Sequence, residues 1–212
     1  MVIFVGFTQS FLDSAGDDIL GAREYGPATP DTITASAGND LLFGDVLAGY
    51  LFRHTNYNGF LNALALDSGQ SWSTGPEPDV GDDTVPHTRV FSTGLDDDQY
   101  FTVTVGAGET ITIDIDHAYS PIGGGSFDSR VHLYDATQTE VATNNDALAT
   151  LGGLGSEEVS NGLSRDSYLT YTNTGATQLF YVRVTDVTGS GVASGDTYVM
   201  SVSVTGHEAL AT

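Results

Sequence analysis

The chain has 212 residues with 28 acidic and 6 basic side chains, so its formal net charge at pH 7 is −22. A surface this acidic repels phosphate backbones and anionic headgroups, which excludes nucleic acid and disfavours anionic membranes as partners. The sequence has no cysteine, which excludes disulfides, thiolate zinc sites and a cysteine nucleophile. An apolar fraction of 40% is too high for a disordered acidic tail.

The first segment, Met1 to Phe7, is apolar and predicts a β-strand. An alternative is that residues 1–8 pair with another subunit and mediate self-association. The segment has no basic stretch and no small-residue cleavage site, so it does not resemble a cleaved secretory signal. No run of the sequence approaches the ~18 apolar residues of a membrane span. We expect an extracellular or cell-surface protein that is exported without a cleaved N-terminal signal.

The acidic residues are unevenly divided: 21 are aspartate and seven are glutamate, and many aspartates stand beside glycine. Three explanations compete, namely a halophilic surface, an acidic binding face and calcium ligation. A halophilic surface usually uses glutamate freely. Calcium takes about six to eight oxygens from short side chains and main-chain carbonyls, which aspartates in glycine-rich turns supply. The composition therefore favours calcium as the cofactor.

Two nearly identical phrases follow the first segment, Ser14-Ala-Gly-Asp-Asp-Ile-Leu-Gly21 and Ser36-Ala-Gly-Asn-Asp-Leu-Leu-Phe-Gly44, with a weaker echo at Gly81–Val85. They resemble the RTX nonapeptide, whose glycine-rich turns bind calcium. The resemblance implies three calcium ligands: Asp18, Asp40 and Asp83. The copies are not contiguous, so we expect that they do not stack into a β-roll. The alternative for each copy is an ordinary Asp-Gly turn.

Residues 1–95 as a whole are turn-rich, and we expect an irregular N-terminal extension there. The best helix candidate is Asn58–Leu66, in which Phe60, Leu61, Leu64 and Ala65 would share one face. The aromatic residues of this half predict either a satellite core packed on the rest of the chain or a ligand groove for a peptide or glycan: Tyr50, Phe52, Tyr57, Phe60 and Trp72.

Residues 96–205 alternate apolar and polar side chains in short segments, which is the period of half-buried strands. Clear examples are Tyr100–Val105 and Thr197–Val204, and Gly, Asn and Asp mark the joints. About six to eight short strands over this length predict an all-β fold, a jelly-roll-like antiparallel β-sandwich. We therefore expect an extension over 1–95, a sandwich over 96–205 and a tail over 206–212.

Acidic residues recur at strand ends within this sandwich. Asp114 and Asp116 are two apart on one strand, so both carboxylates should project to one side, where a cation or protons must neutralise them. A repeated Asp-Ser phrase, at Asp128 and at Asp166, opens two other strands. With the Asn-Asp pair that follows a further strand, these residues predict a calcium cage from three or four loops at one sandwich end: Asp114, Asp116, Asp128, Asn145, Asp146 and Asp166.

The ordered set of phrases from about 98 to 204 resembles the bacterial pre-peptidase C-terminal domain. The matching stretches are Tyr100–Glu109, Ile111–Asp116, Ser126–Ser129, Leu133–Asp135, Asn144–Asp146, Asp166–Leu169, Phe180–Val184 and Gly195–Val202. This resemblance covers half the chain and implies a β-sandwich similar to the calcium-binding, collagen-binding domains of clostridial collagenases. It also implies a usually non-catalytic module that assists export, folding or substrate targeting. Asn145-Asp146 stands where longer members often carry two aspartates.

The sequence carries none of the common catalytic motifs. There is no nucleophile elbow, His-Glu-x-x-His or phosphate loop, and the five histidines lack close metal-binding spacing, so we expect no enzyme. The first hypothesis is a non-catalytic, calcium-binding extracellular module for adhesion or for binding a peptide, glycan or protein ligand in an exported RTX-type protein. The alternative is a self-assembling filament or surface-layer subunit. A third is an accessory domain of a secreted hydrolase. The residues that would bind a ligand are not predicted.

Overall fold

The computed structural model describes residues 2–6, 10–12, 19–23, 32–34, 41–43, 50–53, 57–68, 72–74, 80, 84–116, 118, 127–148, 158–159 and 162–208. The chain forms two compact units. One is Met1–Ala48 with Ile122–Gly124, and we call it the N-terminal unit. The other is Gly49–Pro121 with Gly125–Thr212, and we call it the sandwich unit.

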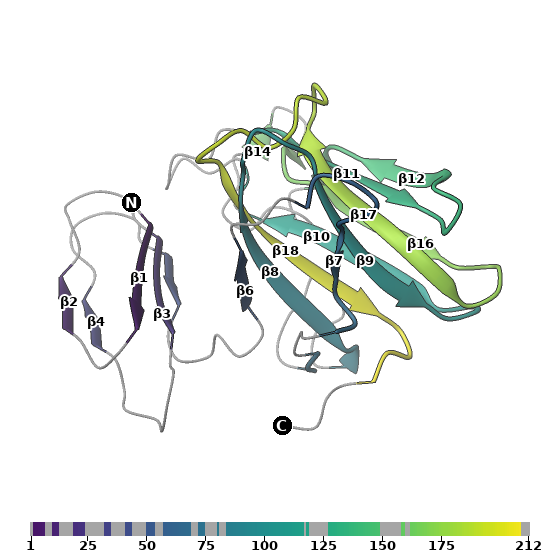
Figure 1. The fold of residues 1–212 in the computed structure, drawn as a ribbon, viewed down its shortest axis with the longest axis horizontal. Coiled ribbons are helices and arrows are strands. Elements are labelled where there is room, and N and C mark those ends of the chain that lie inside the picture. The colour runs from purple at the N-terminus through teal and green to yellow at the C-terminus, as the bar shows by residue number, and fades with distance from the viewer. Residues whose placement is uncertain are drawn as a thin grey trace. The chain divides into compact units, whose positions relative to one another are not determined.

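The N-terminal unit holds short strands in two parallel sheets (Figure 1). The strands are β1 (Val2–Gly6), β2 (Ser10–Leu12), β3 (Ile19–Arg23), β4 (Thr32–Thr34) and β5 (Leu41–Phe43). One sheet has the order β1-β3-β5, and the other pairs β2 with β4. Ile19 pairs with Leu41 and Ser10 with Thr32, an offset of 22 residues in both cases, whereas Val2 pairs with Ile19 at an offset of 17. The chain therefore alternates between two parallel sheets.

The strand expected in the first segment is confirmed as β1, which pairs with β3. The two RTX-like phrases run into β3 and β5, which pair in parallel and in register. The expectation that separated copies do not stack was therefore wrong for these strands. A parallel pair needs only a crossover of about a dozen residues or more between its strands, and the chain between β3 and β5 supplies it.

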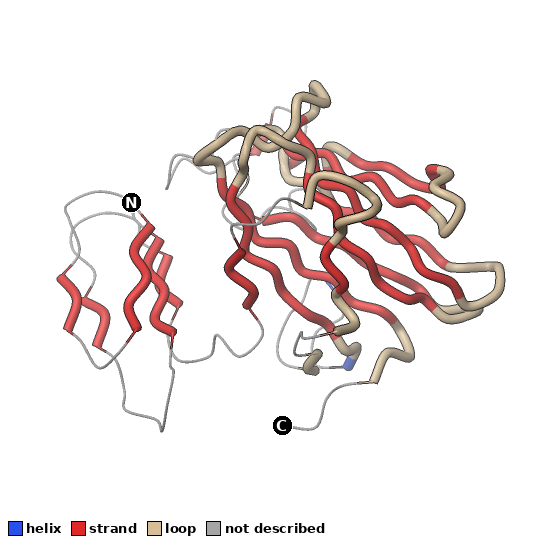
Figure 2. Tube along the Cα trace, in the orientation of Figure 1, coloured by secondary structure: helices blue, strands red, loops and turns tan. Residues whose placement is uncertain are grey.

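The sandwich unit has two five-stranded sheets, drawn as arrows in Figure 1 and in red in Figure 2. The first sheet has the order β16-β10-β18-β8-β6, with β6 (Tyr50–Arg53), β8 (His87–Thr93), β10 (Thr110–Asp116), β16 (Tyr168–Thr172) and β18 (Thr197–Val204). The second has the order β12-β11-β17-β9-β7, with β7 (Leu64–Ala65), β9 (Gln99–Val105), β11 (Ser129–Tyr134), β12 (Glu140–Asn144) and β17 (Gln178–Asp186). A small sheet joins β13 (Ala147–Leu148), β14 (Glu158–Val159) and β15 (Leu163–Ser164). The predicted all-β sandwich is confirmed.

Alternating side chains build the core between the two large sheets. Ile111, Ile113 and Ile115 of β10 are fully buried, and so are Phe180 and Val182 of β17. Burying one such side chain contributes roughly 1.5–3 kcal/mol. Because successive residues of a strand point to opposite faces, the residues between these positions lie on the outer faces of the sheets.

The sandwich unit begins earlier in the chain than expected. Strands β6, β7 and β8 precede residue 95, yet each is hydrogen-bonded into a sandwich sheet. The unit therefore starts at Gly49, which differs from the boundary expected between residues 95 and 96. Strand β8 pairs with β18 near the C-terminus, and such a contact between distant segments leaves no local sequence pattern.

The helix predicted over Asn58–Leu66 is wrong. The Asn62 amide donates to the Gly59 carbonyl in a tight turn, and the chain then enters β7. Leu64 and Leu66 are buried, whereas Leu61, which a helix would place on the same face, is fully exposed. The Leu66 amide donates to the Thr102 carbonyl, so pairing with β9 overrides the weak helical period.

Candidate functional site

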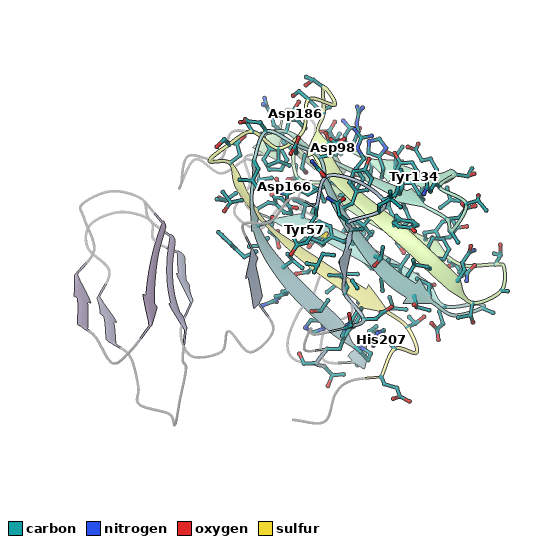
Figure 3. The ribbon with its side chains drawn as sticks, in the orientation of Figure 1. Tyr57, Asp98, Tyr134, Asp166, Asp186 and His207 are labelled. Carbon is teal, nitrogen blue, oxygen red and sulfur yellow. The ribbon has the colours of Figure 1, made fainter. Side chains whose placement is uncertain are left out.

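The antiparallel order brings many aspartates to one end of the sandwich unit. Strands β8, β10, β12 and β17 end there, and β9, β11, β16 and β18 begin there. We call this the acidic end, and its aspartates are Asp96, Asp97, Asp98, Asp116, Asp128, Asp146, Asp166, Asp186 and Asp196. Figure 3 labels Asp98, Asp166 and Asp186 at this end and His207 toward the other.

The two Asp-Ser phrases face each other across the sandwich. The Ser167 amide donates to Ser129 Oγ at 2.9 Å, and the Ser167 hydroxyl donates to the Ser129 carbonyl at 2.8 Å. Both serines are fully buried. Ser129 is the first residue of β11 and Ser167 directly precedes β16, so the prediction that each phrase opens a strand is confirmed. This double contact joins the two sheets beneath Asp128 and Asp166.

Asn144 holds the end of β12 against the start of β16, beside the contact between Ser129 and Ser167. Its side-chain oxygen accepts the Tyr168 amide at 3.1 Å, and its amide group donates to the Asp146 carbonyl at 3.1 Å. The Asn145 side-chain amide donates to Asp146 Oδ2 at 3.0 Å. The predicted residues Asn145 and Asp146 are therefore held beside the serine contact.

Asp128 is a carboxylate of this end whose pKa is shifted from its ordinary value. Its Oδ1 is buried and has no hydrogen-bond partner among the described residues. Partial burial raises the pKa of Asp128, the nearby Asp146 raises it further, Arg165 lowers it and Asp186 raises it again. Partial burial and the charges of Asp146 and Asp186 therefore outweigh the attraction of Arg165 and Arg130, so ionised Asp128 costs energy in the folded state.

Asp186 was missed in the sequence analysis. It is the last residue of β17, and its Oδ1 accepts the Thr188 amide at 2.8 Å and the Thr188 hydroxyl at 2.6 Å. The Val187 amide donates to the Asp128 carbonyl at 2.7 Å, which brings the two segments together. The Asp-x-Thr turn after an alternating strand was a signal that could have drawn attention to it.

Asp114 and Asp116 follow the alternation of β10 away from the core, so the prediction that they share a face agrees with the buried isoleucines between them. Both are buried, with exposed fractions of 0% and 4%. Asp114 pairs with Tyr168 and with Ser201, and the Ile115 amide donates to the Ser167 carbonyl. This register sets Asp116 opposite Asp166, which is also buried.

The candidates come from both sheets, because β10 and β16 belong to one sheet and β11, β12 and β17 to the other. Asp114, Asp116 and Asp166 flank the first sheet, and Asp128, Asn145 and Asp146 flank the second. Among the residues that the structure describes, no three acidic or histidine side chains converge closely enough to hold a metal by themselves. Calcium at either group would need main-chain and amide oxygens as well, which calcium accepts. Asp18, Asp40 and Asp83 lie outside the described residues.

The raised pKa of Asp128 predicts a pH effect on the calcium-free protein. Its pKa lies above the ordinary value of 3.8, so the folded state holds the proton more tightly than the unfolded chain. At neutral pH, ionised Asp128 therefore lowers the free energy of unfolding. This loss disappears as the pH falls through the raised pKa toward 3.8 and Asp128 takes up a proton. In EDTA, the melting temperature of Asp128→Asn should exceed that of the wild type at about pH 7 and approach it at about pH 4. A difference that stays constant over this range would contradict the prediction.

The comparisons with known proteins add no function. No family model and no curated protein matches the chain. Among solved structures it is similar to PliG of Aeromonas hydrophila, a periplasmic inhibitor of g-type lysozyme, with 14% identity over 57% of this chain and 87% of that one. The TM-score is 0.34, which is too low to carry an argument. Within the described part of the chain, no helix is long and apolar enough to span a bilayer.

Proposed function

We propose that the chain is a non-catalytic, calcium-binding extracellular module that adheres to or binds a ligand. The observation that carries the calcium proposal is the half-buried carboxylate of Asp128, whose buried Oδ1 has no hydrogen-bond partner in the described part of the chain and whose pKa is raised by the nearby charges of Asp146 and Asp186. Asp128 is influenced by two further carboxylates, Asp146 and Asp186, and by two guanidinium groups, Arg165 and Arg130, so negative charge is in excess around it, which favours a bound cation. Carboxylate and amide oxygens are the ligands that calcium prefers.

Calcium at this group would link three segments. Asp128 precedes β11, Asp146 follows β12 and Asp186 ends β17. Without an ion their mutual repulsion loosens the acidic end, and with an ion the same carboxylates become a cross-link. Binding energy then contributes to folding, since the unfolded chain has no such site. The resemblance to the pre-peptidase C-terminal domain supports a non-catalytic, exported module of this kind.

The test is a thermal melt of the purified chain in EDTA, in calcium and in magnesium. At a calcium concentration about a hundred times the dissociation constant, binding should add about 2.7 kcal/mol, or roughly 5–10 °C in melting temperature. Magnesium should add much less, because it demands near-octahedral geometry and keeps its water. No rise with calcium would mean that the aspartates are only surface charge.

Two variants locate the effect. Asp128→Asn and Asp146→Asn should each reduce the calcium-induced rise strongly and leave the calcium-free protein at least as stable as the wild type. The matched control is Asp135→Asn, at the opposite end of β11, where Oδ1 accepts from Thr137 and Thr139 and an asparagine oxygen can do the same. Equal calcium responses in all three variants would place the ion elsewhere.

A further inference from the structure

An asparagine stands directly before a glycine at the start of the turn that leads into β7. Asn58 is exposed, its chain neighbour is Gly59, and the Asn62 amide closes the turn by donating to the Gly59 carbonyl at 3.2 Å. The side-chain carbonyl carbon of an asparagine and the main-chain nitrogen of the next residue can close a five-membered ring. They are therefore an electrophile and a nucleophile that the chain itself holds in proximity.

The Gly59 nitrogen is available for this reaction. Within the described ranges, its amide donates no hydrogen bond. Glycine has no Cβ, so its nitrogen can approach the preceding side chain closely. The φ of Gly59 is not left-handed, and an added Cβ would meet only Asn62 Oδ1, at an ordinary contact distance of 3.5 Å. The turn itself therefore does not require glycine here, and alanine at this position leaves the fold unstrained.

The Asn58 side chain is held with its carbonyl polarised. Asn58 Oδ1 accepts the Asn62 side-chain amide at 2.9 Å, and Asn58 Nδ2 donates to Asp97 Oδ2 at 3.3 Å. A donor on a carbonyl oxygen stabilises the negative charge that this oxygen takes up when a nucleophile adds to its carbon. The Asn62 side chain therefore stands where such a donor is needed.

Asn58 differs from the other asparagines that the structure describes. Each of those is followed by a residue with a Cβ, namely Ala63, Asn145, Asp146 or Thr174. A Cβ on the following residue hinders the approach of its nitrogen. The second Asn-Gly pair of the chain begins at Asn161, which lies outside the described residues. In the described part, exposure, a following glycine and a polarised carbonyl occur together at Asn58.

We propose that Asn58 is a self-modification site, which the folded protein converts to aspartate and isoaspartate through a cyclic succinimide. The Gly59 nitrogen forms a bond to the side-chain carbonyl carbon of Asn58, and the bond from that carbon to Nδ2 breaks. Water carries the proton of the Gly59 amide to Nδ2, which leaves as ammonia. Water then adds to either carbonyl of the ring and opens it, and the Gly59 nitrogen regains a proton. A molecule of water is consumed, ammonia is released, and nothing is oxidised or reduced.

The product changes what holds the turn. An aspartate at position 58 has no donor for Asp97, so like charges replace a hydrogen bond at this point. The isoaspartate product also routes the main chain through the former side chain, which lengthens it by a methylene. Phe60 lies just beyond, with its ring centroid 4.9 Å from that of Tyr100 and 5.1 Å from that of Tyr181. Modification therefore loosens the Phe60 turn from β9 and β17.

The test is prolonged incubation of the folded full chain in EDTA at mildly alkaline pH, followed by trypsin digestion and mass spectrometry. Trypsin cuts after Arg53 and Arg89, so one fragment holds Asn58 and Asn62 and excludes Asn161. We expect the mass gain of an amide replaced by a carboxyl at residue 58, labelling of that residue by an isoaspartate-specific methyltransferase, and an unchanged Asn62. This reaction needs no calcium ligand, so its outcome is separate from that of the calcium melt.

Three variants assign the parts of the reaction. Gly59→Ala should abolish the mass gain at residue 58, whereas the matched control Gly175→Ala, also at a φ that is not left-handed, should leave it unchanged. Asn62→Ala should slow the gain by roughly two- to tenfold in the folded protein, the contribution of one hydrogen bond, and should have no effect in urea. A residue 58 that keeps its amide as long as Asn62 does would overturn the proposal, and so would an equal gain in Gly59→Ala.

The effect on the turn has its own measurement. Asn58→Ala removes the bond to Asp97, and Asn58→Asp removes it and adds a charge. Asn58→Asp should therefore melt at a lower temperature than Asn58→Ala, and the difference should shrink at about 1 M salt, where the Debye length is ~3 Å. Equal melting temperatures of the two variants would contradict the loosening of the turn by repulsion.

Discussion

Replacing Trp72 by alanine is expected to lower the free energy of unfolding of the sandwich unit by about 3–5 kcal/mol. The Trp72 ring is 1% exposed and belongs to the core. Its Nε1–H donates to the Leu66 carbonyl at 2.9 Å, and its ring stacks on His207 with centroids 3.7 Å apart and planes at 12°. The alanine variant loses the apolar burial, the hydrogen bond and the ring stacking, and it leaves a cavity.

Urea denaturation measures this effect as a lower midpoint with an unchanged slope. The control is Leu61→Ala, which removes a fully exposed side chain before residue 95 and should shift the midpoint very little. The contrast shows whether the chain before residue 95 is structurally part of the sandwich unit. A loss below about 1 kcal/mol for Trp72→Ala would mean that this segment is accessory to the fold.

Replacing Gly191 by alanine is expected to cost about 2–4 kcal/mol of stability. Its φ is +82°, and an added Cβ would lie 2.6 Å from the backbone of Asp97. The loops meet tightly here, since the Val192 amide donates to the Asp97 carbonyl and the Asp96 amide to the Val192 carbonyl. An added methyl therefore forces two segments of the acidic end apart.

Gly189 provides the matched control. Its φ of +78° is equally left-handed, but an added Cβ would meet nothing within 4 Å. Gly189→Ala should therefore lower the free energy of unfolding only by the cost of placing alanine in a left-handed backbone conformation, about 1–2 kcal/mol. Chemical denaturation of the two variants separates steric crowding from backbone strain. Equal losses would show that the close approach at Asp97 contributes nothing.

Much of the sandwich could be predicted from local patterns. Alternation located β9, β10 and β18, because the period of two is a property of a half-buried strand and is visible within a few residues. The repeated Asp-Ser phrase marked two strand starts for the same local reason. The gathering of strand-end aspartates at one end followed from expecting antiparallel strands, and the sheet order agrees.

The candidate site was predicted only in part. The predicted residues come from strands of both sheets at one end of the sandwich unit, the calcium cage itself stays a prediction, and Asp186 was overlooked. Which aspartates approach one another depends on sheet order and on the face that each side chain takes. A one-dimensional pattern does not contain that pairing.

Other features required the three-dimensional structure. Strands β6 to β8 join the sandwich through partners far along the chain, so the boundary near residue 95 had no support beyond a change in local regularity. The turn at Phe60 satisfied a helical spacing, but burial of Leu64 and Leu66 against β9 decided its conformation. Local periodicity specifies strands, whereas packing between distant strands decides which side chains meet.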